Sequence, residues 1–259
     1  MIIKAHGSLG DEVMLTGLPE AYNKITGQFI GITTNRHYLW ENNPYIKDSS
    51  REEFSYAFNV YPKDYLIYYP IRLFFDLTGF IVDRNLVQPN LYKPRVENNE
   101  KIIVVNDEAG WPSRRGYPYF NTLCKDLKDL GYAIYYTRGN TLDCMGHQSE
   151  KTITNYTYND NGGTPNLVQV IDLLQRAAFY IGYDSGLAQL AGALKVPYVL
   201  LSLAIPPINT AHNSCIYALD TCKHDCQEHS KYLHVDKNRE IVERIGSFEK
   251  WNFRYAYPR

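Results

Sequence analysis

The sequence predicts an α/β fold, because three stretches of the chain each combine a buried strand, a short turn and a helix. The clearest is FYIGYDSGLAQLAGALKVPYVLL, residues 179–201, in which two apolar strands flank an Ala-rich helix. The second runs from Ile102 to Thr137, and the third opens the chain at Met1–Ala5. In such sheets ligands bind beyond the carboxyl ends of the strands, where helix N-termini offer free N–H groups to anions.

The sequence of the N-terminal half predicts few helices and strands. They are, in order, a strand at Met1–Ala5, a glycine-containing turn at 6–10, an amphipathic helix at Asp11–Lys24, a strand at Gln28–Thr33 and a helix at Ile71–Leu77. Between Asn35 and Lys93 the aromatic patches and charged stretches show no clear alternation of strand and helix.

A second unit follows the polar stretch VENNEK, residues 96–101. We therefore predict one domain over residues 1–97 and a second over 98–259, which ends in a C-terminal arm. The elements predicted for the second unit are strands at Ile102–Asn106 and Ala133–Thr137, helices at Tyr119–Leu130 and Leu167–Ala177, a strand ending near Gly182, a helix at Leu187–Leu194, a strand at Val196–Leu201 and a helix at Asp236–Phe248.

Composition narrows the class of protein. With 259 residues and 44% hydrophobic residues the chain can bury a full core. A net charge of -1 does not call for nucleic acid or an anionic membrane as a partner. The N-terminus does not read as a secretory signal, no apolar run approaches the length of a membrane span, and the five cysteines do not suggest a disulfide framework. These features predict a cytoplasmic protein without a transmembrane segment.

Three stretches resemble glycosyltransferase family 9, which includes the bacterial lipopolysaccharide heptosyltransferases. HGSLGDEVMLTGLPEAYNK and the later ENNPYIKD resemble the family's N-terminal domain, and IIVVNDEAGWPSRRGYPYFNTLCKDLKDLGYAIYYTRG is similar to the stretch that opens its nucleotide-sugar domain. YIGYDSGLAQLAGALKVPYVLL resembles its DSG or DTG turn. The matches cover most of the chain except roughly residues 50–95 and the C-terminal fifth. The resemblance implies a GT-B fold, in which two Rossmann-like domains face each other across a cleft, here with a reduced N-terminal domain on the acceptor side.

The resemblance also implies an activity. It is metal-independent, inverting transfer of a heptose-like sugar or a hexose from a nucleotide-diphosphate donor, ADP-heptose or another, to a hydroxyl on a glycan or lipid-linked acceptor. One alternative is a macromolecular acceptor, either a protein or a hydroxymethylated base in phage-type DNA, although the lack of positive charge opposes DNA. Another is a non-catalytic nucleotide-sugar-binding protein, which the presence of Asp11, Arg114 and the DSG turn opposes.

Asp11 is the predicted catalytic base. Transfer to a hydroxyl needs a group that accepts the hydroxyl proton, and the family places its catalytic carboxylate after the first glycine-containing turn. The plainer interpretation is that Asp11 caps the helix, since Asp is a preferred capping residue. Gly10, like Gly7, would allow the backbone to approach the sugar phosphate closely.

The remaining donor-binding residues are predicted from two loops. Ser113, Arg114 and Arg115 lie where the family carries a basic residue that reaches the diphosphate, and an arginine could neutralise the leaving group without a metal. In the DSG turn, Asp184 is predicted to bind a ribose or sugar hydroxyl, and Ser185 and Gly186 the pyrophosphate; an ordinary capped turn is the alternative.

Gln189 is also predicted to contact the donor. It stands where the family often has a histidine, so this chain lacks a titratable cation there and its donor contacts are expected to differ.

A cysteine- and histidine-rich segment precedes the C-terminal helix. It contains His212, Cys215, Cys222, His224, Cys226 and His229. Thiolates with imidazole can hold zinc or iron, and some relatives carry cysteine-rich segments here, so Cys215, Cys222 and Cys226 are candidate ligands of a structural zinc or iron. The spacing is not that of a standard CxxC pair, and free thiols remain the alternative. Catalysis is predicted to require no cofactor.

Overall fold

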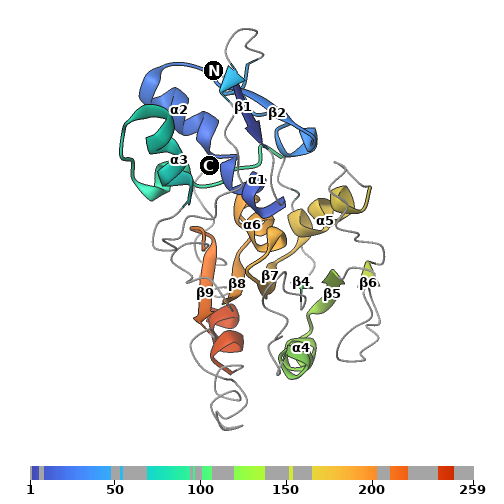
Figure 1. The fold of residues 1–259 in the computed structure, drawn as a ribbon. Helices are drawn as coiled ribbons and strands as arrows, with labels where there is room; N and C mark the ends of the chain where they lie inside the picture. Colours follow the sequence, from blue (N-terminus) through green and yellow to red (C-terminus); the bar gives the residue numbers. More distant parts are fainter. Residues whose placement is uncertain are drawn as a thin grey trace.

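The computed structural model describes the residues 2–5, 9–47, 53–54, 69–93, 96, 101–106, 120–137, 152–153, 165–202, 211–220 and 239–247. These residues form two parallel β-sheets, one in each half of the chain (Figure 1). The N-terminal sheet has the strand order β2-β1-β3, and the C-terminal sheet the order β6-β5-β4-β7-β8-β9. The predicted α/β class is therefore confirmed.

The N-terminal half surrounds its sheet with short helices. Its elements are β1 (Ile2–Ala5), α1 (Leu9–Leu15), α2 (Leu18–Thr26), β2 (Gly31–Thr34), the 3-10 helix η1 (His37–Leu39), β3 (Glu53–Phe54), α3 (Tyr69–Thr78) and the 3-10 helix η2 (Arg84–Val87).

The prediction of one continuous helix over Asp11–Lys24 is wrong, because the structure divides this segment into α1 and α2. Pro19 lies at the start of α2 and has no N–H to donate within a continuous helix. The Thr16 hydroxyl donates to the Val13 carbonyl at 2.7 Å, which closes the last turn of α1. Gly17 sits so close to the Gln88 carbonyl that a Cβ there would overlap it.

The C-terminal half contains the larger sheet. Its elements are β4 (Ile102–Asn106), α4 (Phe120–Asp129), β5 (Ala133–Thr137), β6 (Thr152–Ile153), α5 (Pro165–Arg176), β7 (Phe179–Tyr183), α6 (Gly186–Ala193), β8 (Tyr198–Ser202) and β9 (Cys215–Asp220), and residues 239–247 are helical. β4 and β5 match their predicted bounds to the residue. β9 was not predicted, because its segment was interpreted through its cysteines rather than its apolar residues.

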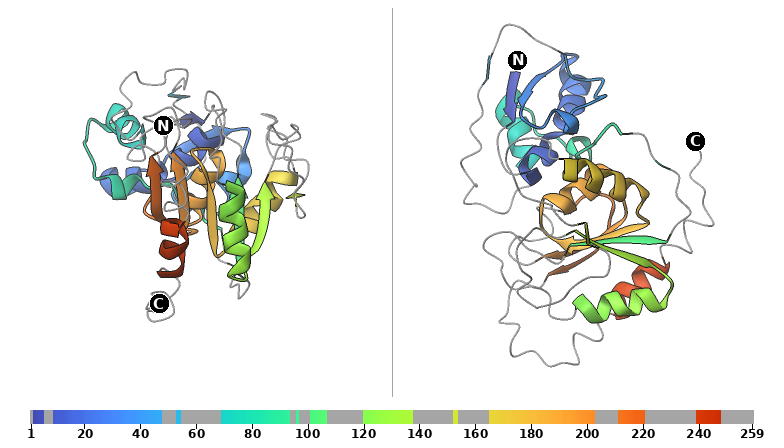
Figure 2. Two further views of the ribbon diagram at one scale, coloured as in Figure 1. Left: turned by 90° about the horizontal axis from the view of Figure 1, so that it is seen from below. Right: turned by 90° about the vertical axis from the view of Figure 1, so that its right-hand side faces the viewer.

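Helices cover both faces of the larger sheet. In the right-hand view of Figure 2, α5 and α6 lie between the sheet and the N-terminal half, while α4 and residues 239–247 lie on the opposite face. Successive residues of β7 alternate accordingly, with Tyr180 in the core on the α6 side and Phe179 and Ile181 in the core on the α4 side. The first core is continuous with the apolar residues of α1, α2 and α3, so the two halves share one buried cluster. None of the described helices has the length and apolar character that crossing a bilayer requires.

Candidate functional site

The two halves of the protein meet where α1 and α6 begin. Each helix follows a parallel strand, α1 after β1 and α6 after β7. A Cβ added to Gly10 would lie 3.3 Å from the Gly186 Cα, and one added to Gly186 would lie 3.1 Å from the Gly10 backbone nitrogen. Two glycines thus let two backbones approach closely at the ends of the parallel strands, where α/β proteins bind ligands. Both had been predicted as donor-binding residues.

Asp11 and Asp184 approach each other across this contact from opposite halves of the chain. Asp11 is the third residue of α1, two residues after the helix begins, and it is partly exposed. Its negative charge contributes to raising the pKa of Asp184, which places the two carboxylates within electrostatic reach. The structure therefore brings together the predicted base and the predicted donor-binding carboxylate, which are far apart in the sequence.

Asp184 occupies the connection between β7 and α6 and is held in a perturbed electrostatic state. Burial raises its pKa to about 6, and the charge of Asp11 acts in the same direction. A long hydrogen bond opposes the rise, since the Gln189 side-chain amide donates to Asp184 Oδ1 at 3.4 Å. Perturbed carboxylates of this kind are concentrated at functional sites.

Several buried polar atoms at the ends of β4 and β7 have no hydrogen-bond partner among the described residues. They are Asn106 Oδ1, the Tyr180 hydroxyl and the Ser185 hydroxyl. Burial raises the pKa of Tyr180, and the nearby Ser185 hydroxyl acts in the opposite direction, but neither hydroxyl forms a hydrogen bond of good geometry with a described residue. Buried polar groups are nearly always satisfied, so unpaired atoms near the Asp184 carboxylate fit a polar ligand.

Ser185 takes the N-cap position of α6 without acting as a cap. Its backbone is extended, with φ -151 and ψ 170, but its side chain makes no capping hydrogen bond. A capped turn was the alternative interpretation of this motif, and Ser185 does not support it. The hydroxyl remains beside the N–H groups of the first turn of α6, which is a favourable place for a phosphate.

Asn106 and Tyr180 were not predicted as site residues. Asn106 is the last residue of the buried strand β4. Its amide nitrogen donates to the Thr137 carbonyl at 2.9 Å, which leaves its amide oxygen without a partner among the described residues at the C-terminal end of the strand. A polar residue that closes an apolar strand is the signal that could have identified it. Tyr180 carries no comparable signal, because an aromatic residue inside a strand usually belongs to the core.

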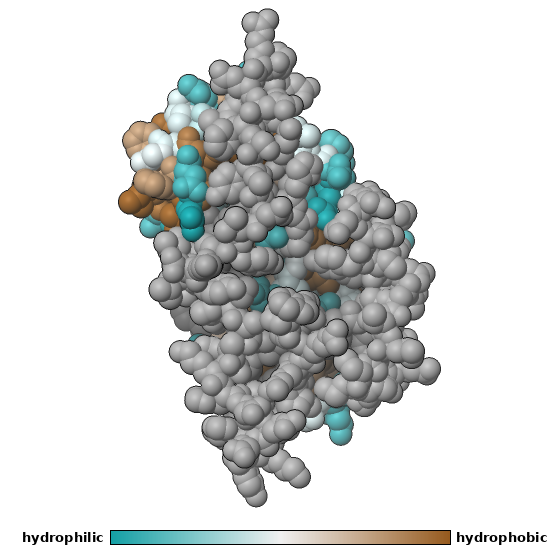
Figure 3. All heavy atoms as spheres, viewed as in Figure 1, coloured by the Kyte–Doolittle hydropathy of each residue, from teal (hydrophilic) through white to brown (hydrophobic). Residues whose placement is uncertain are grey.

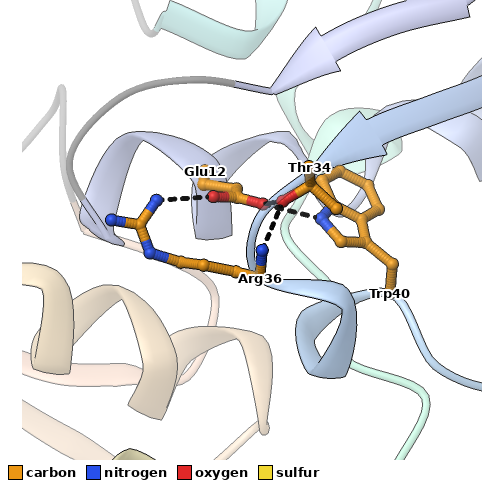
Figure 4. Close-up of polar contacts among 4 residues, drawn as sticks. All are labelled: Glu12, Thr34, Arg36 and Trp40. Atoms are coloured by element: carbon orange, nitrogen blue, oxygen red, sulfur yellow. Dashed lines mark hydrogen bonds and ion pairs between the residues drawn. The ribbon is translucent and has the colours of Figure 1, made fainter. Parts of the chain in front are cut away.

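Glu12, the neighbour of Asp11, is fixed inside the N-terminal half (Figure 4). Its carboxylate accepts from Arg36 Nη1 at 2.8 Å, from Trp40 Nε1 at 2.9 Å and from the Thr34 hydroxyl. Only 1% of Glu12 is exposed. Because consecutive helical residues point in different directions, Glu12 anchors α1 from one side and leaves Asp11 on another.

Other predicted site residues lie outside the part of the chain that the structure describes: Ser113, Arg114, Arg115, Cys222 and Cys226. Cys215 is described and begins β9, where its thiol contacts the Tyr217 carbonyl at 3.3 Å. Burial raises the pKa of Cys215 to about 11, so the thiol is neutral. No group of three potential metal ligands occurs among the described residues, which leave out Cys222 and Cys226. The structural zinc or iron stays a prediction.

The raised pKa of Asp184 predicts that the free energy of unfolding depends on pH. The folded pKa of about 6 exceeds the ordinary value of 3.8 for an aspartate, so this group stabilises the fold fully below pH 3.8 and loses that contribution as the pH rises through 6. Above pH 6 the ionised carboxylate costs about 3 kcal/mol. Asp184→Asn should therefore raise the free energy of unfolding by up to about 3 kcal/mol at pH 8, with little effect near pH 4.

Urea denaturation at pH 4 and pH 8 measures this difference, with Asp172→Asn as the control because Asp172 is exposed on α5. The same change in stability at both pH values, or an equal effect of Asp172→Asn, would contradict the assignment.

Comparison with known proteins places these observations in a family. The fold resembles a family 9 glycosyltransferase from Veillonella parvula DSM 2008, with a TM-score of 0.64 and 13% identity over 95% of each chain. It also resembles the iron-containing dodecameric glycosyltransferase TibC from enterotoxigenic E. coli H10407, with a TM-score of 0.65 and 18% identity over 99% of this chain and 77% of that one.

A third similar structure is the E. coli ADP-heptose lipopolysaccharide heptosyltransferase II, with a TM-score of 0.62 and 14% identity over 96% of this chain and 99% of that one. No curated protein matches the sequence. At these identities the structures establish a GT-B-like fold alone. The sequence model of glycosyltransferase family 9 (heptosyltransferase) matches residues 81–240, more than half of the 259 residues. The chain therefore belongs to glycosyltransferase family 9, the heptosyltransferase family.

Proposed function

We propose that this protein transfers a heptose or a related hexose from a nucleotide-diphosphate donor to a hydroxyl acceptor in a single displacement with inversion. The observation that carries the proposal is the approach of Asp11 and Asp184 across the α1–α6 contact. Asp11 accepts the hydroxyl proton, the hydroxyl oxygen attacks the anomeric carbon, and the bond from that carbon to the diphosphate breaks. The diphosphate leaves with the electron pair.

The donor lies on the α6 side in this proposal. Asp184 accepts a hydrogen bond from a ribose or sugar hydroxyl, and the first turn of α6 together with the Ser185 hydroxyl receives the diphosphate. Arg114 and Arg115 would add positive charge to the leaving group, so that no metal is needed. ADP-heptose is the preferred donor, because a structure of the heptosyltransferase TibC contains ADP-D-beta-D-heptose and one of E. coli WaaC contains ADP.

The acceptor binds to the N-terminal half, which we propose to be a reduced acceptor domain. Its sheet has three described strands, against six in the C-terminal half. Three exposed apolar residues lie in α3 and just after it: Phe75, Phe80 and Ile81. Figure 3 shows brown residues gathered on this side of the N-terminal half. Exposed apolar groups of this kind favour an acceptor with an apolar part, such as a lipid-linked glycan, over a protein or DNA.

Thermal unfolding with a panel of nucleotide sugars tests the donor assignment. A ligand that binds only the folded state adds about 2.7 kcal/mol to the free energy of unfolding at one hundred times its Kd. ADP-heptose is expected to raise the unfolding temperature more than GDP- or UDP-sugars do, and ADP release should accompany transfer to a lipid-linked acceptor. Equal shifts with all nucleotides would contradict donor selectivity, and the absence of any shift would contradict the function.

A further inference from the structure

His212 is buried against α6, beside Gly192. It lies in the segment 211–213 that leads into β9, and only 5% of it is exposed. A Cβ on Gly192 would overlap the imidazole ring and would lie 2.8 Å from its Cγ. The missing side chain at Gly192 thus forms the space in α6 that the His212 ring fills.

The imidazole ring is hydrogen-bonded to the donor-side residues through Gln189. His212 Nε2 contacts Gln189 Oε1, and Gln189 Nε2 donates to Asp184 Oδ1 at 3.4 Å. Above pH 6, where Asp184 is ionised, its carboxylate can only accept, so the amide nitrogen of Gln189 has to face Asp184 and its oxygen has to face His212. His212 must therefore carry its proton on Nε2. Burial, followed by the charge of Arg84, lowers the pKa of His212 to about 3, so the ring is neutral.

The backbone around His212 is held from two directions. Its own N–H donates to the Tyr198 hydroxyl at 2.7 Å. The Asn213 N–H donates to Gln88 Oε1 at 3.1 Å, and the Arg84 guanidinium donates to the Ala211 carbonyl. These contacts fix the backbone at His212, and the close packing of the ring against Gly192 limits its rotation away from Gln189.

We propose that His212 is a positioning residue for the donor site, because its Nε2–H fixes the orientation of the Gln189 amide and thereby the carboxylate of Asp184. One carboxylate oxygen is then held by the protein and the other is left for a donor hydroxyl. This inference rests on the proposed function, in which Asp184 binds the donor. A histidine that only fills space would need neither a defined tautomer nor a hydrogen bond to Gln189.

The kinetic test compares two substitutions of His212. His212→Gln keeps an N–H donor near the position of Nε2, whereas His212→Phe keeps a ring of similar shape without a donor. We expect His212→Phe to raise the KM for the nucleotide sugar about tenfold with kcat changed less than about threefold, and His212→Gln to restore the KM to within about threefold of the wild type. Equal KM values in the two variants would overturn the proposal.

Two NMR measurements test the same contact without any turnover. A long-range proton–nitrogen spectrum of the wild-type protein should show His212 as the Nε2–H tautomer, assigned by its loss in His212→Phe. The Asp184 pKa should rise in His212→Phe, because the hydrogen bond from Gln189 lowers it in the wild type. An Nδ1–H tautomer or an unchanged Asp184 pKa would overturn the inference. If no nucleotide binds while both NMR results are as expected, the proposed function is rejected but the hydrogen-bonded chain from His212 through Gln189 to Asp184 is retained.

Discussion

An Asp11→Asn variant is expected to bind the nucleotide sugar almost as tightly as the wild type and to transfer the sugar about 10²- to 10⁴-fold more slowly, the contribution that a general base usually makes. Asparagine has the shape of aspartate but cannot accept the proton of the acceptor hydroxyl. The defect should therefore appear in kcat, with the donor affinity preserved.

The structure strengthens the case against a purely capping role for Asp11. α1 begins at Leu9, so Asp11 lies inside the first turn rather than before it. The charge of Asp11 also contributes to the raised pKa of Asp184 across the α1–α6 contact. Asp11→Asn should lower that pKa, which carbon NMR of Asp184 can follow.

The controls separate catalysis from binding. Asp184→Asn is expected to show the opposite pattern, a weaker donor affinity with a smaller effect on kcat, because Asp184 contacts the donor rather than the acceptor hydroxyl. Single-turnover transfer and calorimetric titration of the nucleotide on both variants distinguish the two patterns. An Asp11→Asn variant with an unaltered rate would remove Asp11 as the base and leave it as a residue that favours the N-terminus of α1.

The strands of the C-terminal half were predictable because they are apolar on both faces. Ile102–Asn106 lies between Lys101 and Asp107, and Ala133–Thr137 follows Gly131 and Tyr132 and is followed by Arg138; burial on both faces requires continuous apolar runs. The break between α1 and α2 was missed, because the apolar spacing of Asp11–Lys24 continues through Thr16 and Gly17 and outweighed Pro19 in the prediction. β9 was missed because Cys215 and the cysteines after the strand suggested metal ligands instead of a strand.

The candidate site was predictable only where a local motif marked it. Asp11 comes shortly after the first strand and directly after Gly10, and Asp184 comes directly after β7 and two residues before Gly186. An acidic residue beside a glycine at the end of a strand is visible in the sequence. The pairing of His212 with Gln189 depends on how β9 lies against α6, and no local pattern encodes this packing. In the sequence His212 stands out only as part of the cysteine- and histidine-rich segment.

Glu12→Ala is expected to lower the free energy of unfolding by about 3–5 kcal/mol, the usual cost of removing one partner of a buried ion pair. Arg36 is only 7% exposed and would lose the carboxylate that balances its charge. Trp40 Nε1 and the Thr34 hydroxyl would lose their acceptor as well. Because these three donors come from β2 and the segment after it, α1 would lose its principal polar attachment to the N-terminal sheet.

Urea denaturation of a small set of variants tests this account of α1. The matched control is Glu243→Ala, which removes the exposed i,i+4 pair with Arg239 and should cost less than about 0.5 kcal/mol. A double variant, Glu12→Gln with Arg36→Met, removes both charges and should be less destabilised than the sum of the single variants. A loss below about 1 kcal/mol in Glu12→Ala would contradict the anchoring role. If that role is correct, the Glu12→Gln variant should transfer the sugar more slowly than the wild type at a temperature where both are folded. The reason is that α1 carries Asp11, and a less firmly held helix positions the base less well.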